Sequence, residues 1–235
     1  MEETPQRVLV VTPHPGNAEI WCGGTLARWI GQGTEVVYVL CTDGGKGTDK
    51  AGITAQELAA TRDREQVAAA DVLGVREIVK LGHPDGELED TGEFRKQLVR
   101  EIRRVQPDVV MVTEPYVRSM VWHRDRRVAG QVALDAVFPY ARDHLHFGEL
   151  WSEEGLEPHK TGTILFWGTE RADTFIDIGE TMEVKLAAVQ AHKSQVADHP
   201  EREVVDYVYQ RARDAGAEGG CQYAEAFRRV NFRTG

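Results

Sequence analysis

The sequence predicts an α/β fold in which helices cover both faces of a mostly parallel β-sheet. Three observations support this prediction. Short apolar runs alternate with helical segments along most of the chain, as in doubly wound sheets. Several of these runs lack polar residues at alternate positions, which is typical of strands buried on both faces. No repeat, low-complexity tract or Pro/Ser-rich linker divides the 235 residues, so we expect a single domain over residues 1–235.

The first half of the chain contains the clearest elements. Residues 7–11 are a β-branched run that a Thr-Pro pair ends, which indicates a buried strand followed by a loop. Residues 24–29 have the apolar spacing of a helix, and residues 36–41 are again a continuous apolar strand. Residues 54–73 are an Ala-rich helical segment that begins with the Thr and Glu spacing of a capping box. The strand–helix–strand order implies right-handed parallel units and a three-layer, Rossmann-like domain.

The second half continues the alternation. Residues 77–81 indicate a third strand, residues 92–105 a helix, and residues 109–112, after a Pro-Asp pair, a fourth strand. The same criteria predict strands at residues 163–167 and 174–178 and helices at residues 127–140, 180–195 and 203–215. Ligands of such sheets bind beyond the carboxyl ends of the strands. This rule points to the loops at residues 12–24, 42–48 and 113–126.

Composition and charge exclude several classes of protein. Lys and Arg total 28 against 38 for Asp and Glu, and the net charge of -10 disfavours nucleic acid as a partner. No apolar run approaches the roughly 20 residues that cross a bilayer, and the first residues lack the basic-then-apolar order of a signal peptide. We therefore expect a cytoplasmic protein that binds no membrane. Cys22, Cys41 and Cys221 lie far apart, without zinc-finger spacing, and are expected to be free thiols.

Four segments of the chain carry a resemblance to a known family. They are His14-Pro15-Gly16-Asn17, His83-Pro84-Asp85-Gly86, His123-Arg124-Asp125-Arg126 and His192-Lys193-Ser194-Gln195. In this order they resemble the LmbE-like or PIG-L-like N-deacetylases, which act on N-acetylated amino sugars and their conjugates. The resemblance implies a deacetylase-like carbon–nitrogen hydrolase fold and a small-molecule ligand from metabolite or natural-product biosynthesis. It also allows a homo-oligomer.

The chain departs from the family at the positions that carry its chemistry. The family's first motif reads His-Pro-Asp-Asp, in which the His and the second Asp bind zinc and the first Asp is the general base. Here Gly16 stands at the base position and Asn17 at the ligand position, and Arg126 replaces the last histidine of the third motif. Asn17 offers only a neutral carbonyl oxygen and Arg126 has no acceptor atom, so His14 alone remains a competent zinc ligand.

These departures lead to two competing expectations for function. The first is a homologue without a general base, a family-type metal site or any cofactor, which binds a ligand or performs altered chemistry. The alternative is an active N-deacetylase of an amino-sugar-like or other amide metabolite, with zinc held by a rearranged ligand set. His14, His83, Asp85, His123 and Asp125 all lie in loops expected to meet at one edge of the sheet, and such mixtures of His and Asp suit zinc. The rearranged set would use His14 and His123 with one carboxylate.

Further residues are expected to line the pocket. Arg126 can bind a carboxylate or phosphate of an anionic ligand through its planar guanidinium, with Arg124 or Arg127 nearby. Glu19, at the start of the first helix, and His192 are additional pocket candidates. Structural explanations stay open beside these expectations. Asp125 can pair with an arginine, and residues 83–86 can form a simple turn.

Overall fold

The computed structural model describes residues 4–117, 123–198 and 201–233. Its centre is a seven-stranded sheet with the strand order β3-β2-β1-β4-β5-β7-β6. The strands are β1 (Arg7–Thr12), β2 (Glu35–Thr42), β3 (Glu77–His83), β4 (Val109–Thr113), β5 (Thr163–Trp167), β6 (Thr174–Asp177) and β7 (Ala224–Asn231). The first five are parallel, and β7 pairs antiparallel with β5 and with β6. The predicted α/β class and mostly parallel sheet are confirmed.

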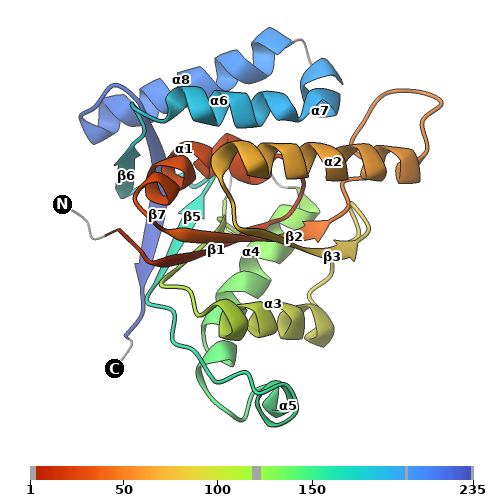
Figure 1. Ribbon diagram of the computed structural model, residues 1–235, viewed down its shortest axis with the longest axis vertical. Coiled ribbons are helices and arrows are strands. Elements are labelled where there is room, and N and C mark those ends of the chain that lie inside the picture. Colours follow the sequence, from red (N-terminus) through yellow and green to blue (C-terminus); the bar gives the residue numbers. More distant parts are fainter. Residues whose placement is uncertain (1–3, 118–122, 199–200, 234–235) are drawn as a thin grey trace.

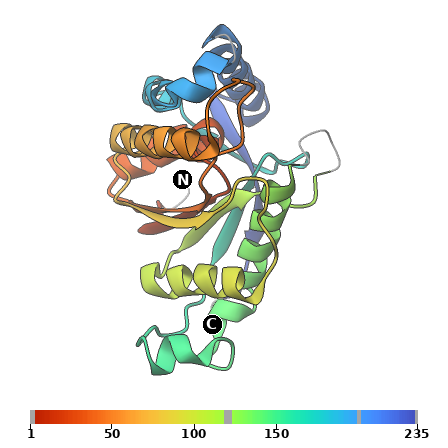
Figure 2. The ribbon, with the colours of Figure 1, turned by 90° about the vertical axis from the view of Figure 1, so that its right-hand side faces the viewer.

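Helices cover both faces of this sheet (Figures 1 and 2). One face carries α1 (Asn17–Gly31) and α2 (Ala55–Leu73), and the other carries α3 (Gly92–Val105) and α4 (Arg124–Val137), with the short α5 (Gly148–Ser152) beyond α3. The last helices, α6 (Met182–Ala191), α7 (Lys193–Asp198) and α8 (Glu201–Gly219), form a further layer outside α1 and α2. None of the described helices combines the length and the apolar character needed to cross a lipid bilayer.

The two faces of the sheet explain why its central strands are apolar throughout. In β1, Val8 and Val10 pack with α1, whereas Leu9 and Val11 pack with α3 and α4. Both faces are therefore buried, and alternation between apolar and polar residues would leave polar side chains in a core. The capping box at the start of α2 is present, since the Thr54 side chain accepts from the Glu57 backbone and the Glu57 carboxylate accepts from the Thr54 backbone.

Several predicted boundaries are wrong. The helix expected at residues 24–29 already begins at Asn17, directly after Gly16, whose φ of 87° ends the preceding loop. The helix expected at residues 127–140 is α4, which begins three residues earlier because His123 caps it by accepting from the Asp125 N–H. The helix expected at residues 180–195 is broken at His192 into α6 and α7.

Strand β7 is an element that the sequence prediction missed. Its Glu225 reaches into the layer between α1 and α6, where its carboxylate accepts hydrogen bonds from the backbone N–H groups of Gly24 (3.0 Å) and Thr25 (2.7 Å). Lys185 of α6 forms an ion pair with the same carboxylate, and both side chains are buried. The last strand therefore connects the sheet, the inner helix and the outer helical layer.

Helix α4 lies unusually close to the end of β4. A Cβ atom added at Gly130 would be 2.4 Å from the carbonyl oxygen of Thr113 and 3.1 Å from the Pro115 side chain. Only a residue without a side chain allows this approach. Gly130 therefore sets how closely the first turn of α4 lies to the carboxyl edge of the sheet.

Candidate metal centre at the carboxyl edge of the sheet

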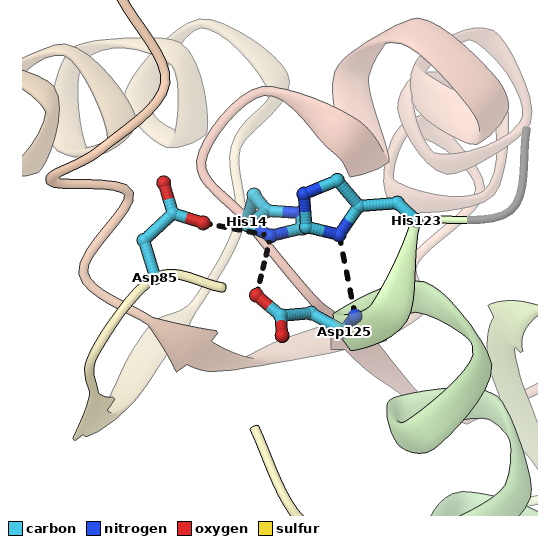
Figure 3. A group of neighbouring side chains, drawn as sticks. All are labelled: His14, Asp85, His123 and Asp125. Carbon is cyan, nitrogen blue, oxygen red and sulfur yellow. Dashed lines mark hydrogen bonds and ion pairs between the residues drawn. The ribbon is translucent and has the colours of Figure 1, made fainter. Parts of the chain in front are cut away.

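Four titratable side chains meet at the carboxyl edge of the sheet (Figure 3). His14 follows β1 and Asp85 follows β3, while His123 and Asp125 lie at the start of α4, beyond β4. Because β2 separates β1 from β3, the loop after β3 reaches across that edge to bring Asp85 to the others. The expected convergence is therefore present for these four residues. His83, which was expected to join them, interacts with Gln97 and lies outside the group.

The geometry of this four-residue group is compact. His14 Nε2 lies 2.9 Å from Asp125 Oδ2 and 3.1 Å from Asp85 Oδ1. The imidazole rings of His14 and His123 meet edge to face with their centroids 4.4 Å apart. His14, Asp85 and Asp125 are buried and His123 is exposed, and one ligand atom from each residue lies within 4.8 Å of the others.

Asp125 is the fixed member of the group. Its Oδ2 accepts from the Gly86 N–H at 2.7 Å and its Oδ1 accepts from the Leu88 N–H at 3.1 Å, in addition to the contact with His14. The side chain is fully buried. The alternative in which Asp125 pairs with an arginine is wrong. The Asp125 carboxylate instead connects the loop after β3 to His14.

The negative charges of Asp85 and Asp125 stabilise a positive charge on His14, and that positive charge in turn stabilises the carboxylates. Burial opposes the charged form of His14, but hydrogen bonds and charges from Asp125 and Asp85 outweigh burial and raise its pKa. Burial likewise raises the pKa of Asp85, and the hydrogen bond and charge of His14 overcome this effect and lower it to about 2. Burial and the positive charge of His14 lower the pKa of His123. The two carboxylates thus favour a positive charge at the Nε2 side of His14.

This donor set fits a zinc ion. Zinc bonds of about 2.0–2.2 Å in a tetrahedral site place neighbouring ligand atoms roughly 3.4 Å apart. The present separations of 2.9 and 3.1 Å, with all four donors inside 4.8 Å, need only small side-chain movements to reach that value. Two imidazoles and two carboxylates are also ordinary zinc donors. Among the described residues this is the one group with such a composition.

The loop after β2 positions Asp85 and has no free phosphate cradle. Asp85 Oδ2 accepts from the Lys46 N–H at 3.1 Å, and the Asp85 N–H donates to Asp43 at 3.1 Å. The carbonyl groups of Gly44 and Gly47 accept from the Arg62 guanidinium. The glycine-rich loop therefore turns carbonyl oxygens towards a buried arginine and holds the second carboxylate of the group.

The family's base and ligand positions lie at one side of the group. A Cβ atom at Gly16 would be 2.9 Å from Gln195 Nε2, which donates to the Pro15 carbonyl at 2.9 Å. Asn17 Oδ1 is 3.4 Å from His14 Nδ1, the ring nitrogen that faces away from the carboxylates. The Arg126 side chain is half-buried and its Nε has no hydrogen-bond partner among the described residues. These three residues do not belong to the four-residue group.

Glu19 and His192 form a separate buried pair. Glu19 Oε2 lies 3.4 Å from His192 Nε2, without the geometry of a hydrogen bond, and both side chains are buried. Gln66 connects this pair to the site loop, since it donates to Glu19 at 2.8 Å and accepts from the Gly16 N–H at 3.1 Å. Gln66 was missed by sequence reasoning because a glutamine inside an Ala-rich helix carries no functional signal.

A polar cavity of about 190 Å³ opens beyond the ends of β4 and β5. Its lining residues are Glu114, Tyr116, Val117, Thr169, Glu170, Arg171 and Arg228. Glu114 and Arg228 form an ion pair across it, with Arg228 Nη2 donating to Glu114 Oε1 at 3.1 Å. These residues come from three separate stretches of sequence. The sequence analysis pointed to the loop at residues 113–126, which contains the first stretch, but not to the other two. Trp122, in the third motif, lies outside the described residues.

Comparisons with known proteins identify relatives of this chain. The family model described as GlcNAc-PI de-N-acetylase, PIG-L, matches residues 9–137. A diacetylchitobiose deacetylase of Thermococcus kodakarensis is 35% identical over 225 residues, which cover 96% of this chain and 83% of the relative. A 1D-myo-inositol 2-acetamido-2-deoxy-alpha-D-glucopyranoside deacetylase of Segniliparus rotundus is 26% identical, over 81% of this chain and 77% of the relative.

A solved structure has the same architecture. The N,N'-diacetylchitobiose deacetylase from Pyrococcus horikoshii, in complex with an inhibitor, superposes with a TM-score of 0.91 at 32% identity. The match covers 97% of this chain and 84% of that structure. The matched residues, the identity over nearly the whole chain and the shared sheet together show that this chain belongs to the PIG-L (LmbE-like) family, whose matched relatives are named as deacetylases.

Proposed function

We propose that this chain is a metal-dependent N-deacetylase of a small amide-bearing metabolite, with a ligand set shifted from the family's usual positions. The group of His14, Asp85, His123 and Asp125 is the observation that carries this proposal. It counts against the expectation that His14 alone remains competent, because the loss of ligands at Asn17 and Arg126 is matched by other donors at the same edge of the sheet.

His14, His123 and Asp125 would hold the metal ion and leave a position open for water. When bound, the ion polarises the acyl oxygen of an amide and lowers the pKa of a water molecule. Asp125 is suited to a constant position, since two backbone N–H groups fix its carboxylate. His14 Nε2 lies between the two carboxylates, and there it would bind the metal in place of a proton. His123 is exposed, so it lies where a ligand can approach.

A proton acceptor is needed in place of the side chain that Gly16 lacks. Asp85 is the candidate, because among the described residues its Oδ1 contacts His14 alone, whereas both oxygens of Asp125 accept backbone hydrogen bonds. An acceptor within hydrogen-bond reach of the attacking water contributes about 100- to 10,000-fold to such reactions. Asp85 would take the proton of the water and pass it to the leaving amine.

The substrate class follows from the relatives. Their printed names are those of deacetylases acting on diacetylchitobiose and on an acetamido-glucopyranoside, so an N-acetylated amino sugar or a similar amide is the expected substrate. The polar cavity lined by Glu114, Tyr116 and Arg171 offers hydrogen-bonding groups for the remainder of such a molecule. The small substrates in the relatives' names and the size of the cavity also support a small-molecule ligand in place of nucleic acid.

A metal-free binding protein is the second candidate, and a specific observation favours it. Gln195 fills the space beside Gly16, so the region of the family's general base is occupied by an amide that binds the Pro15 carbonyl. In this candidate the His14 proton stays between the two carboxylates, and the site binds its ligand without cleaving it.

Metal analysis separates the two candidates. Untagged protein purified without chelator, then challenged with zinc and dialysed, should retain about one zinc per chain, and it should release amine from N-acetylated amino sugars. His123→Ala should lose both properties. The matched control is His83→Ala, because His83 ends β3 nearby but binds Gln97 and lies outside the group. Protein that stays folded and retains no zinc would support the binding protein and refute the metal-dependent enzyme.

A further inference from the structure

Arg126 is a partly buried cation that has no anionic partner in the described chain. It lies in the first turn of α4, directly after Asp125, and its Nε makes no hydrogen bond. Burial lowers the pKa of its guanidinium, and the only described group whose charge opposes this effect is the Tyr207 hydroxyl of α8. A desolvated cation of this kind destabilises the fold unless an anion accompanies it.

The neighbouring arginines do not share this condition. Arg124 pairs with Glu89 at 3.5 Å, and Arg127 also has an interaction partner. The chain has 38 acidic residues against 28 basic ones, so acidic partners are abundant. The isolation of Arg126 is therefore a property of its position and not of the composition.

Arg126 directly follows Asp125 in the first turn of α4 and stands three residues after His123, so its backbone borders the four-residue group. After burial and the charge of His14, the charge of Arg126 is among the influences on the pKa of His123, so the two side chains act on each other electrostatically. On the other side, Tyr207 belongs to an aromatic rim in which the Arg211 guanidinium lies 5.6 Å from the Tyr207 ring and 4.2 Å from the Trp21 ring. Arg211 and the rings of Tyr207 and Trp21 thus form one cluster, and the charge of the Tyr207 hydroxyl relates this cluster to Arg126.

We propose that Arg126 binds an oxyanion, a carboxylate or a phosphate, that belongs to the same small molecule whose amide reaches the metal group. A guanidinium presents two parallel N–H donors that match both oxyanions, and the neighbouring cation and aromatic rings favour a negatively charged, partly cyclic ligand. As a statement about a substrate, this inference rests on the proposed function; the anion site itself does not. Arg126 is then a specificity-determining residue.

Calorimetric titration with inorganic phosphate and with acetate tests the anion site. Wild type should bind at least one of them, and Arg126→Met should bind it at least tenfold more weakly. The control Arg124→Met removes an exposed arginine of the same helical turn and should stay within twofold of wild type. The anion that binds more tightly shows whether the site prefers a phosphate or a carboxylate. Equal binding by wild type and Arg126→Met, or no binding by wild type, would overturn the inference.

Two further measurements keep the result unambiguous. Each titration is performed on chelated protein and on protein with one equivalent of zinc, because phosphate can also bind a metal directly. Arg126→Met should fold at least as stably as wild type without anion, while phosphate should raise the Tm of wild type alone. Protein that retains no added zinc but binds an anion through Arg126 would refute the proposed enzyme and keep this inference. If the protein retains zinc and Arg126→Met binds anions as tightly as wild type, this inference is refuted and the proposed enzyme is kept.

Discussion

Asp125→Asn is expected to be the most destabilising conservative change in the site. The carboxylate is fully buried and has three hydrogen-bond partners, at 2.7, 2.9 and 3.1 Å. Asparagine keeps one acceptor oxygen and turns an NH₂ group towards a backbone N–H donor, so at least one buried donor loses its acceptor. It also leaves the His14 imidazolium with Asp85 alone. Removing one partner of a buried charged pair costs about 3–5 kcal/mol.

Urea unfolding of zinc-free protein measures this loss. The midpoint should fall while the slope with denaturant stays unchanged, because the change alters stability and not the surface exposed on unfolding. Asp85→Asn is the matched control. The Asp85 carboxylate has two partners in the described part of the chain, the Lys46 N–H and His14, so the substitution should cost about 1–3 kcal/mol. If Asp125→Asn is no more destabilising than Asp85→Asn, the assignment of Asp125 as the fixed member of the group is wrong.

Three further predictions follow from the same contacts. The folded protein raises the pKa of His14, so the charged ring stabilises zinc-free protein below the unfolded pKa of about 6.5. This contribution is lost as pH rises through the folded pKa. Because zinc binds the neutral ring, the zinc-induced rise in Tm should be larger at pH 8 than at pH 6. Gly16→Ala should cost about 1–2 kcal/mol for its left-handed backbone, with an additional loss that Gln195→Ala relieves in a double-mutant cycle. Lys185→Met should cost about 3–5 kcal/mol in urea unfolding because Glu225 stays buried without its cation, and adding Glu225→Gln should recover part of that loss.

The central sheet could be predicted from the sequence because strands buried on both faces are uninterrupted apolar runs. Strands β1, β2, β4 and β5 fall within one or two residues of their predicted positions. Strand β7 could not, because Arg228 and Arg229 interrupt its apolar pattern at an antiparallel position near the edge of the sheet. The start of α4 was placed too late because histidine is an unusual N-cap residue.

The candidate site was predictable only as a set of residues. Parallel strands bring the ends of β1, β3 and β4 to one edge, which is why His14, Asp85 and His123 could be expected together. The bonds from Asp125 to the Gly86 and Leu88 backbone have no sequence signal, because backbone donors are the same in every residue. The separate pairing of Glu19 with His192 could not be predicted, because the sequence indicates the helices at residues 180–195 and 203–215 but not their packing outside α1.

Gly130 has a consequence for how the spacing within the site can change. His123 and Asp125 belong to one rigid helix, while His14 and Asp85 belong to loops anchored on the sheet. A methyl group at position 130 would need about 1 Å more space than the 2.4 Å that separates its Cβ from the Thr113 carbonyl. Such a substitution would move one imidazole and one carboxylate together, away from the other pair. The spacing of the proposed metal donors can therefore be changed from a residue that is not itself a donor, with every donor atom retained.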